Sequence, residues 1–227
     1  MGCRLWAVGL VWLGALAPLP AWAQASSPPG PYVLDLHVAT SALPQAPGFF
    51  PVLPSGTFIP ARGLGFDVGV HIYLIRLGPA RLGLGASVLR TRGHASNEPP
   101  ASSSTATRPV ATRPDVDATL TNVAPQLSLN FGSADGWSYI SAGAGQGDVQ
   151  TATSVFTASG SGSTAVTTPA RLSDNPPVRS MNVGGGARWF TRRHLAFSFD
   201  VRFHMLAAGT GTPKTTLLAA SAGLSLR

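Results

Sequence analysis

The stretch that decides the fold is residues 194–207, HLAFSFDVRFHMLA, in which large apolar side chains alternate with small or polar ones. One face of this stretch carries Leu195, Phe197, Phe199, Val201, Phe203 and Met205, and the other carries Ala196, Ser198, Asp200, Arg202 and His204. A period of two belongs to a β-strand whose faces meet different environments, since a helix repeats every 3.6 residues. The stretch therefore predicts a strand with one apolar and one polar face.

Seven further segments predict strands: Tyr32–Thr40, Arg62–Leu77, Arg81–Arg92, Ala118–Phe131, Trp137–Gln150, Pro177–Phe190 and Thr215–Arg227. The faces of the fifth strand stay open, because apolar residues stand on both: Ile140, Ala142 and Ala144 on one, and Trp137, Tyr139 and Val149 on the other.

The gaps between these strands alternate between long and short. The long gaps are Ser41–Ala61, Gly93–Asp117 and Thr151–Pro176, and the tight ones are Gly78–Ala80, Gly132–Gly136 and Thr191–Arg193. In an up-and-down meander, alternate connections gather at opposite ends. Bacterial outer-membrane barrels have short periplasmic turns and long extracellular loops. The sequence therefore predicts an all-β fold, an eight-stranded antiparallel up-and-down transmembrane β-barrel in the bacterial outer membrane.

Glycine indicates which face of the strands points inward. The polar faces contain Gly63, Gly65, Gly69, Gly83, Gly85, Gly184, Gly186 and Gly223. Eight strands enclose an interior only wide enough for side chains to fill, so crowded inward positions favour glycine beside long polar groups. A polar face turned to water has no such preference. We therefore expect the polar face to line the lumen and the apolar face to meet lipid.

Composition supports an apolar environment for one strand face. Charged residues make up only 11% of the 227 residues and the mean hydropathy is +0.19, whereas soluble domains carry about 25% charged residues. After Ala23 no run of 18 apolar residues remains, so we expect no transmembrane helix. The net charge of +7 comes from scattered arginines without a recognition motif, and nucleic acid is not an expected partner.

The N-terminus has the features of a secretory signal. Arg4 precedes an apolar run over Leu5–Leu19, and Ala21-Trp22-Ala23 fits the small-x-small cleavage rule. A membrane anchor is the alternative, but the run is short and Pro18 interrupts it. We expect a cleaved signal peptide over residues 1–23 and one barrel domain over residues 24–227.

Two segments of one predicted hairpin, Val183-Gly-Gly-Gly-Ala-Arg-Trp-Phe190 and Arg193-His-Leu-Ala-Phe-Ser-Phe-Asp-Val-Arg202, resemble the small outer-membrane barrels of the OmpA-like and OmpX-like family. The resemblance implies the generic outer-membrane barrel domain, with the barrel-assembly machinery as a partner. Such barrels often end in Phe or Trp, which that machinery reads, whereas this chain ends Leu224-Ser-Leu-Arg227.

The polar inward face holds the candidate functional residues. We expect a lumen network of Asp67, His71, Asn122, Gln126, Arg188, Asp200, Arg202 and His204. An unpaired buried charge is very costly, so the two arginines are expected to pair with carboxylates such as Asp67 and Asp200. The sequence thus predicts a hydrogen-bonded plug and no open pore.

Aromatic residues flank two of the short turns. Trp137 and Tyr139 follow one turn, and Trp189 and Phe190 precede another. We expect these four residues to form an aromatic girdle at the periplasmic interface. Ordinary packing is the alternative interpretation.

No catalytic, metal or cofactor site is expected. His194 and Ser198 share one strand face with Asp200 but lie about 13 Å apart in an extended strand. Outer-membrane lipid A deacylases place a serine two residues after the histidine, where this chain has Ala196. The five histidines are dispersed, without a metal-ligand spacing.

The long gaps suggest a surface role. Two of them are rich in Ser, Thr, Ala and Pro and are expected to be mobile loops, whereas Ser41–Ala61 contains Phe49 and Phe50 and either binds a partner or lipid or folds over the barrel mouth. We expect a non-enzymatic barrel acting in membrane integrity, surface interaction or adhesion. Its partners would be outer-membrane lipids, lipopolysaccharide and an extracellular ligand. Transport of small solutes or apolar compounds is the alternative, and a lipid-modifying enzyme is less favoured.

Overall fold

The computed structural model describes residues 31–50, 53–97, 114–133, 135–159, 164–168 and 172–227. The expected signal peptide and most of the second long gap lie outside these ranges. The described residues form the strands β1 (Tyr32–Ala42), β2 (Arg62–Leu77), β3 (Ala80–Ala95), β4 (Asp115–Ser133), β5 (Gly136–Ser159), β6 (Thr164–Thr168), β7 (Leu172–Asp174), β8 (Val178–Arg192), β9 (Leu195–Leu206) and β10 (Thr215–Leu226), and one short 3-10 helix, η2 (Pro47–Phe49).

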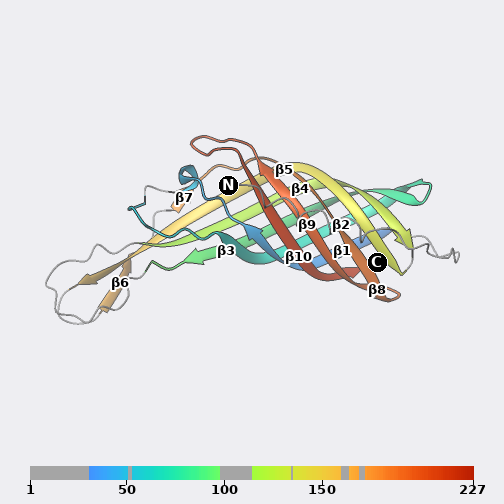
Figure 1. Cartoon of the computed structure of the whole chain (residues 1–227), viewed down its shortest axis with the longest axis horizontal. Coiled ribbons are helices and arrows are strands. Elements are labelled where there is room, and N and C mark those ends of the chain that lie inside the picture. Colours follow the sequence, from blue (N-terminus) through green and yellow to red (C-terminus); the bar gives the residue numbers. More distant parts are fainter. Residues whose placement is uncertain (1–30, 51–52, 98–113, 134, 160–163, 169–171) are drawn as a thin grey trace, which may run out of the picture.

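Eight of these strands close into a barrel (Figure 1). Antiparallel neighbours follow the order β4-β3-β2-β1-β10-β9-β8-β5, and pairing between β4 and β5 completes the ring. The first and last strands pair from Leu34 with Leu226 to Ser41 with Ala219. The predicted eight-stranded antiparallel barrel is therefore confirmed. Within the described part of the chain, no helix has the length and apolar character needed to cross a membrane.

The strands on one side of the barrel run further than the sequence predicted. The segments predicted to end at Arg92 and Gln150 continue to Ala95 and Ser159, and the strand predicted to begin at Ala118 begins at Asp115. Backbone pairing continues there although the apolar alternation has stopped, because ladder hydrogen bonds need no particular side chain. The barrel wall is therefore taller along β3, β4 and β5.

The described part of the third long gap forms strands, which its composition did not predict. In its first part β5 continues and pairs with β6 from Val155 with Thr168 to Ser159 with Thr164, and β7 pairs with β5 over Gln150–Ala152. Threonine recurs in this segment, which also contains Val155 and Val166, and β-branched side chains favour strands. The β5–β6 ribbon projects beyond the barrel at the end opposite the short turns (Figure 1).

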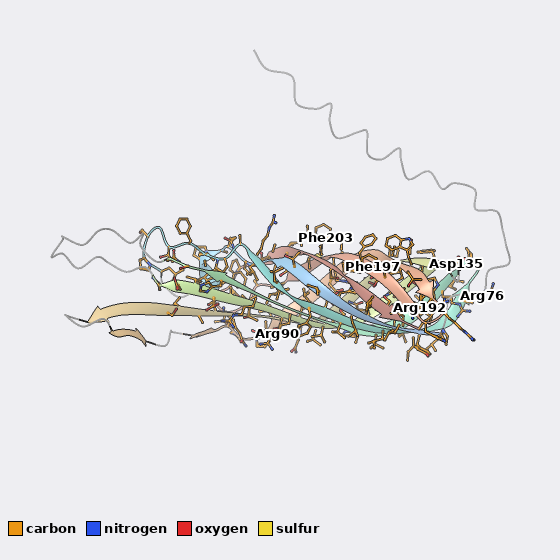
Figure 2. The ribbon with its side chains drawn as sticks, turned by 90° about the horizontal axis from the view of Figure 1, so that it is seen from below. Arg76, Arg90, Asp135, Arg192, Phe197 and Phe203 are labelled. Carbon is orange, nitrogen blue, oxygen red and sulfur yellow. The ribbon has the colours of Figure 1, made fainter. Side chains whose placement is uncertain are left out.

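The outer wall of the barrel is apolar. Along β9, Phe197 and Phe203 are half-exposed and point away from the wall (Figure 2), whereas Ser198 and Asp200 between them are buried inside. The sequence left open which face of the fifth predicted strand points inward. In the structure, Ile140 on this strand faces outward, and Trp137 and Tyr139 face the lumen. The large apolar face is thus the outer one.

Candidate functional site

Glycines make room for large side chains inside the barrel. A Cβ atom on Gly83 would lie 2.5 Å from the ring of Tyr73, and one on Gly186 would lie 2.9 Å from the hydroxyl of Tyr139. Each aromatic ring therefore occupies the space that a side chain on the neighbouring strand would need. This close fit fills the interior with few, large side chains.

A buried ion pair lies near the short-turn end of the lumen. Arg188 on β8 donates from Nε to Asp35 Oδ1 (2.8 Å) and from Nη2 to Asp35 Oδ2 (2.6 Å), and its side chain is 0% exposed. Its guanidinium carbon lies 3.9 Å from the centre of the Tyr139 ring, and Ser225 donates to the same carboxylate. The bidentate geometry satisfies both charges where water cannot reach them.

A second ion pair lies deeper in the barrel, on β9. Arg202 donates to both carboxylate oxygens of Asp200, at 3.2 and 3.0 Å. It also donates to Asn182 Oδ1 and to Ser141 Oγ, each at 2.8 Å. The two charged residues are two positions apart on one strand and so share the inward face. The predicted pairing of Arg202 with Asp200 is present in the structure.

Arg188 pairs with a carboxylate as expected, but with neither of the two carboxylates named as examples. Asp67, offered as a partner for the arginines, is only partly buried and accepts a hydrogen bond from Ser221 at 3.3 Å. Within the described ranges it forms no ion pair. Asp35, which the sequence analysis did not select, holds Arg188 instead. The sequence does indicate that Asp35 points inward, because it alternates with the apolar residues Leu34 and Leu36 in the first strand.

The remaining predicted lumen residues, His71, Asn122, Gln126 and His204, lie in the same polar layer of the interior. His71 Nε2 and Gln126 Oε1 are 3.1 Å apart, Gln126 Nε2 donates to Asn182 Oδ1 at 3.2 Å, and Asn122 donates to Ser180 Oγ at 2.7 Å. Of the eight predicted lumen residues, seven are buried: His71, Asn122, Gln126, Arg188, Asp200, Arg202 and His204. The structure thus brings the predicted set, apart from the more exposed Asp67, into one packed interior.

A serine and a histidine meet inside this layer. His37 Nε2 lies 2.7 Å from Ser198 Oγ, and His37 Nδ1 lies 3.1 Å from Ser221 Oγ. This resembles a nucleophile beside its base. Ser198, however, is 0% exposed, and its Oγ lies 2.7 Å from Ser225 Oγ. His194, considered with Ser198 in the sequence, instead contacts the carbonyl oxygen of Arg227. No substrate could reach Ser198 in this arrangement.

The long-loop end of the lumen is apolar and forms a plug. Its buried members are Ala39, Leu43, Phe49, Phe50, Leu89, Val116, Ala118, Leu120, Val149, Leu206, Leu217 and Ala219. Phe49 comes from η2 in the first long gap, and its carbonyl oxygen accepts hydrogen bonds from Thr151 (3.0 Å) and Asn175 (3.2 Å). Of the alternatives for this gap, the described part folds over the barrel mouth. We call this cluster the mouth plug.

An aromatic cluster forms the floor of the lumen, and three of the four interface assignments, Trp137, Tyr139 and Phe190, were wrong. Trp137 is 1% exposed and Tyr139 is 4% exposed, and Trp137 packs with Val33 and Tyr73 inside the barrel. Consecutive strand residues point to opposite faces, so Trp189 and Phe190 cannot both face lipid. Trp189 is 49% exposed on the outer wall, and Phe190 packs on Trp137 at 4.8 Å between ring centres.

The described residues contain no group of three potential metal ligands. The network of ion pairs, amides and hydroxyls can hold the barrel rigid, and its charged side chains are bound to one another. Chemically, the lumen is a filled interior.

A closed antiparallel barrel with an apolar outer wall and a polar, filled interior is a transmembrane β-barrel. No family model matches this chain, and no curated protein matches it.

Several solved outer-membrane barrels are similar to it in fold. One is Ail, the attachment invasion locus protein of Yersinia pestis, in complex with the heparin analogue sucrose octasulfate (13% identity, TM-score 0.46, 86% of this chain and 96% of that chain). Others are Neisserial surface protein A (12%, 0.43, 86% and 95%) and the N-terminal β-barrel domain of Pseudomonas aeruginosa OprF (8%, 0.36, 86% and 96%). These similarities concern the fold alone.

Proposed function

We propose that this chain is a non-enzymatic outer-membrane β-barrel that presents its loops and the β5–β6 ribbon at the cell surface. The observation that carries the proposal is the filled lumen. An aromatic floor, two buried ion pairs and the mouth plug follow one another along the barrel axis. A barrel filled in this way serves as an anchor in the membrane, and its exposed end is left to interact.

The location in the bacterial outer membrane is part of this proposal. The expected signal peptide would direct the chain to the periplasm, and the barrel-assembly machinery would insert it. The apolar outer wall favours lipid around the strands. The short turns would then lie in the periplasm and the mouth plug on the outside.

The ribbon supports a role in surface interaction or adhesion. Among the described strands, β6 pairs with β5 alone, so its other edge offers backbone donors and acceptors. An extended segment of an extracellular ligand can pair with such an edge. The remaining loops would add contacts to the same partner.

One experiment tests the proposal as a whole. An epitope inserted between Ser159 and Thr164 is expected to be reached by antibody on intact cells. The purified protein is expected to migrate faster on SDS gels unboiled than boiled, and to show no steady conductance in a planar bilayer. Labelling only in permeabilised cells, recovery as a soluble periplasmic protein, or reproducible porin-like conductance would overturn it.

Transport of small solutes or apolar compounds is the second candidate function. It is favoured by a hollow of about 400 Å³ at the mouth, lined by Pro47, Phe50, Leu53, Pro54, Gly56, Thr57 and Ile59. Below this hollow, however, the mouth plug and both ion pairs would have to move for a solute to pass. A lipid-modifying activity is supported only by the contact between His37 and Ser198, which is sealed from solvent.

A further inference from the structure

Three arginines lie together on the outer wall, near the long-loop ends of β2 and β3. Arg92 pairs across the strands with Leu64, and Arg90 pairs with Phe66. Directly paired residues share one face of a sheet, so these arginines point outward with Leu64 and Phe66. Arg62 shares that face two residues before Leu64, and all three arginines are exposed. We call Arg62, Arg90 and Arg92 the arginine cluster.

The arginine cluster lies at the edge of the apolar wall. Below Arg90, the outward positions of β3 are Leu82, Leu84, Ala86 and Val88. The rise and tilt of barrel strands place Arg90 about 23 Å above Arg81 at the short-turn end, close to the ~25 Å height of the apolar band in such barrels. Figure 2 shows Arg90 well removed from Arg76 and Arg192, which lie toward the short turns.

The strand pattern inverts at the same level. Along β4, the outward residues change from Asp117, Thr119 and Thr121 to Val123 and Leu127, while the inward residues change from Val116, Ala118 and Leu120 to Asn122 and Gln126. Polar outside and apolar inside is the pattern of a wall in water, and its reverse is the pattern of a wall in lipid. The pairing of Arg90 with Thr121 places the arginine cluster at this boundary.

The arginine cluster carries more positive charge than its neighbours neutralise. Arg92 Nη2 lies 3.1 Å from Asp117 Oδ1, with side chains 69% and 26% exposed, and His94 contacts the same oxygen. Within the described residues, a second carboxylate nearby is that of Asp148, which accepts a hydrogen bond from Gln150 at 2.8 Å. Within the described part of the chain, Arg62 and Arg90 form no ion pair. Two guanidinium groups therefore remain available to an anion.

The chemistry of this position selects the anion. A guanidinium fork matches the oxygens of a phosphate and binds them bidentately. Thr119 and Thr121 stand beside Arg92 and Arg90 on the outward face of β4 and supply hydroxyl donors. At the outer edge of an apolar band, the phosphates at hand are those of lipid headgroups.

We propose that the arginine cluster, with the hydroxyls of Thr119 and Thr121, binds phosphate groups on the sugar headgroup of lipopolysaccharide in the outer leaflet. The inference rests on the outer-membrane location proposed above. The three clustered arginines lie on one side of the barrel. On the other side, the long-loop end of β8 carries the single outward arginine Arg179, and the outward positions at the long-loop ends of β9 and β10 are uncharged: Phe203, Met205, Thr216 and Leu218.

Binding of lipid A to the folded barrel tests the site. The protein is reconstituted in phosphatidylcholine nanodiscs, and its affinity for fluorescent diphosphorylated lipid A is measured. Replacing Arg62→Gln, Arg90→Gln and Arg92→Gln together is expected to weaken binding at least about tenfold, since each arginine near a charged membrane surface contributes a several-fold gain. Dephosphorylated lipid A is expected to bind the wild type and this variant equally.

A matched control removes the same charge at the other end of the barrel. The triple variant Arg76→Gln, Arg192→Gln and Arg193→Gln is expected to keep wild-type affinity. Equal loss in both triple variants, or no loss in the cluster variant, would overturn the inference. Each protein is first checked for its unboiled gel shift. A wild type without that shift contradicts the barrel function itself, whereas shifted proteins with equal lipid A binding contradict only the site.

Discussion

The membrane part and the mouth part of the barrel are built from the same strands with opposite chemistry. In the membrane part, Arg188 and Asp35 face inward and Phe199 faces outward. In the mouth part, Leu120 faces inward and Arg92 faces outward. The strand pleat continues unchanged, so the difference comes from the surroundings. Lipid requires an apolar wall, and water requires a polar one.

The interiors differ in how they are held together. In the membrane part, charges are satisfied by named partners with directed hydrogen bonds, and losing one partner leaves the other unpaired. In the mouth part, apolar side chains pack without direction, and Phe49 is contributed by a connecting segment. A substitution should therefore lower the free energy of unfolding most in the membrane part, where partners are specific, and less in the mouth part, where a connecting segment can readjust.

The largest effect is expected from Arg188→Leu. This change leaves the Asp35 carboxylate buried without its cation and should lower the free energy of unfolding by about 3–5 kcal/mol. Urea titration of the barrel folded in lipid vesicles measures the loss. The double variant Arg188→Leu, Asp35→Leu should recover at least half of it, because no charge is then stranded. An equal loss in the single and double variants would contradict the role given to the pair.

A smaller effect is expected on the outer wall of the membrane part. Phe199→Arg places a charge against lipid and should cost about 2–4 kcal/mol near the bilayer midplane. Gln150→Arg, on the outward face of β5 in the mouth part, should change stability by less than about 0.5 kcal/mol. The same urea titration compares the two variants. An equal loss of unfolding free energy in the two variants would show that Phe199 and Gln150 meet the same surroundings, and would contradict the distinction between the membrane part and the mouth part.

A loss smaller than those of Arg188→Leu and Phe199→Arg is expected from Phe49→Ala in the mouth plug. A fully enclosed phenylalanine loses about 3–5 kcal/mol on truncation, but η2 belongs to a connection that can relax, so we expect less than about 2 kcal/mol. The opened mouth should bind an apolar fluorescent probe more strongly. Phe58→Ala is the control, because Phe58 is 68% exposed and should alter neither quantity. A loss as large as that of Arg188→Leu would show that the plug is part of the cooperative core.

Several features could be predicted from alternation alone, and others could not. The two faces of β9 followed from the alternation in residues 194–207. The inward position of Arg188 followed in the same way from the alternation in β8. The partner of Arg188 required the closure of β1 against β10, which brings Asp35 near β8 from 153 positions away in the chain. Trp137 was misassigned because its strand has apolar residues on both faces, so alternation could not say which face was inside.

The sequence by itself determined the strands, the direction of their apolar face and the asymmetry of the connections, because these depend on local periodicity and on the choice of solvent. The tertiary structure decided which polar groups meet, that the first long gap plugs the mouth, and that part of the third gap is a ribbon. These depend on register around a closed ring, where one shift would turn every side chain to the other face. Such a register is set by the whole set of strands together.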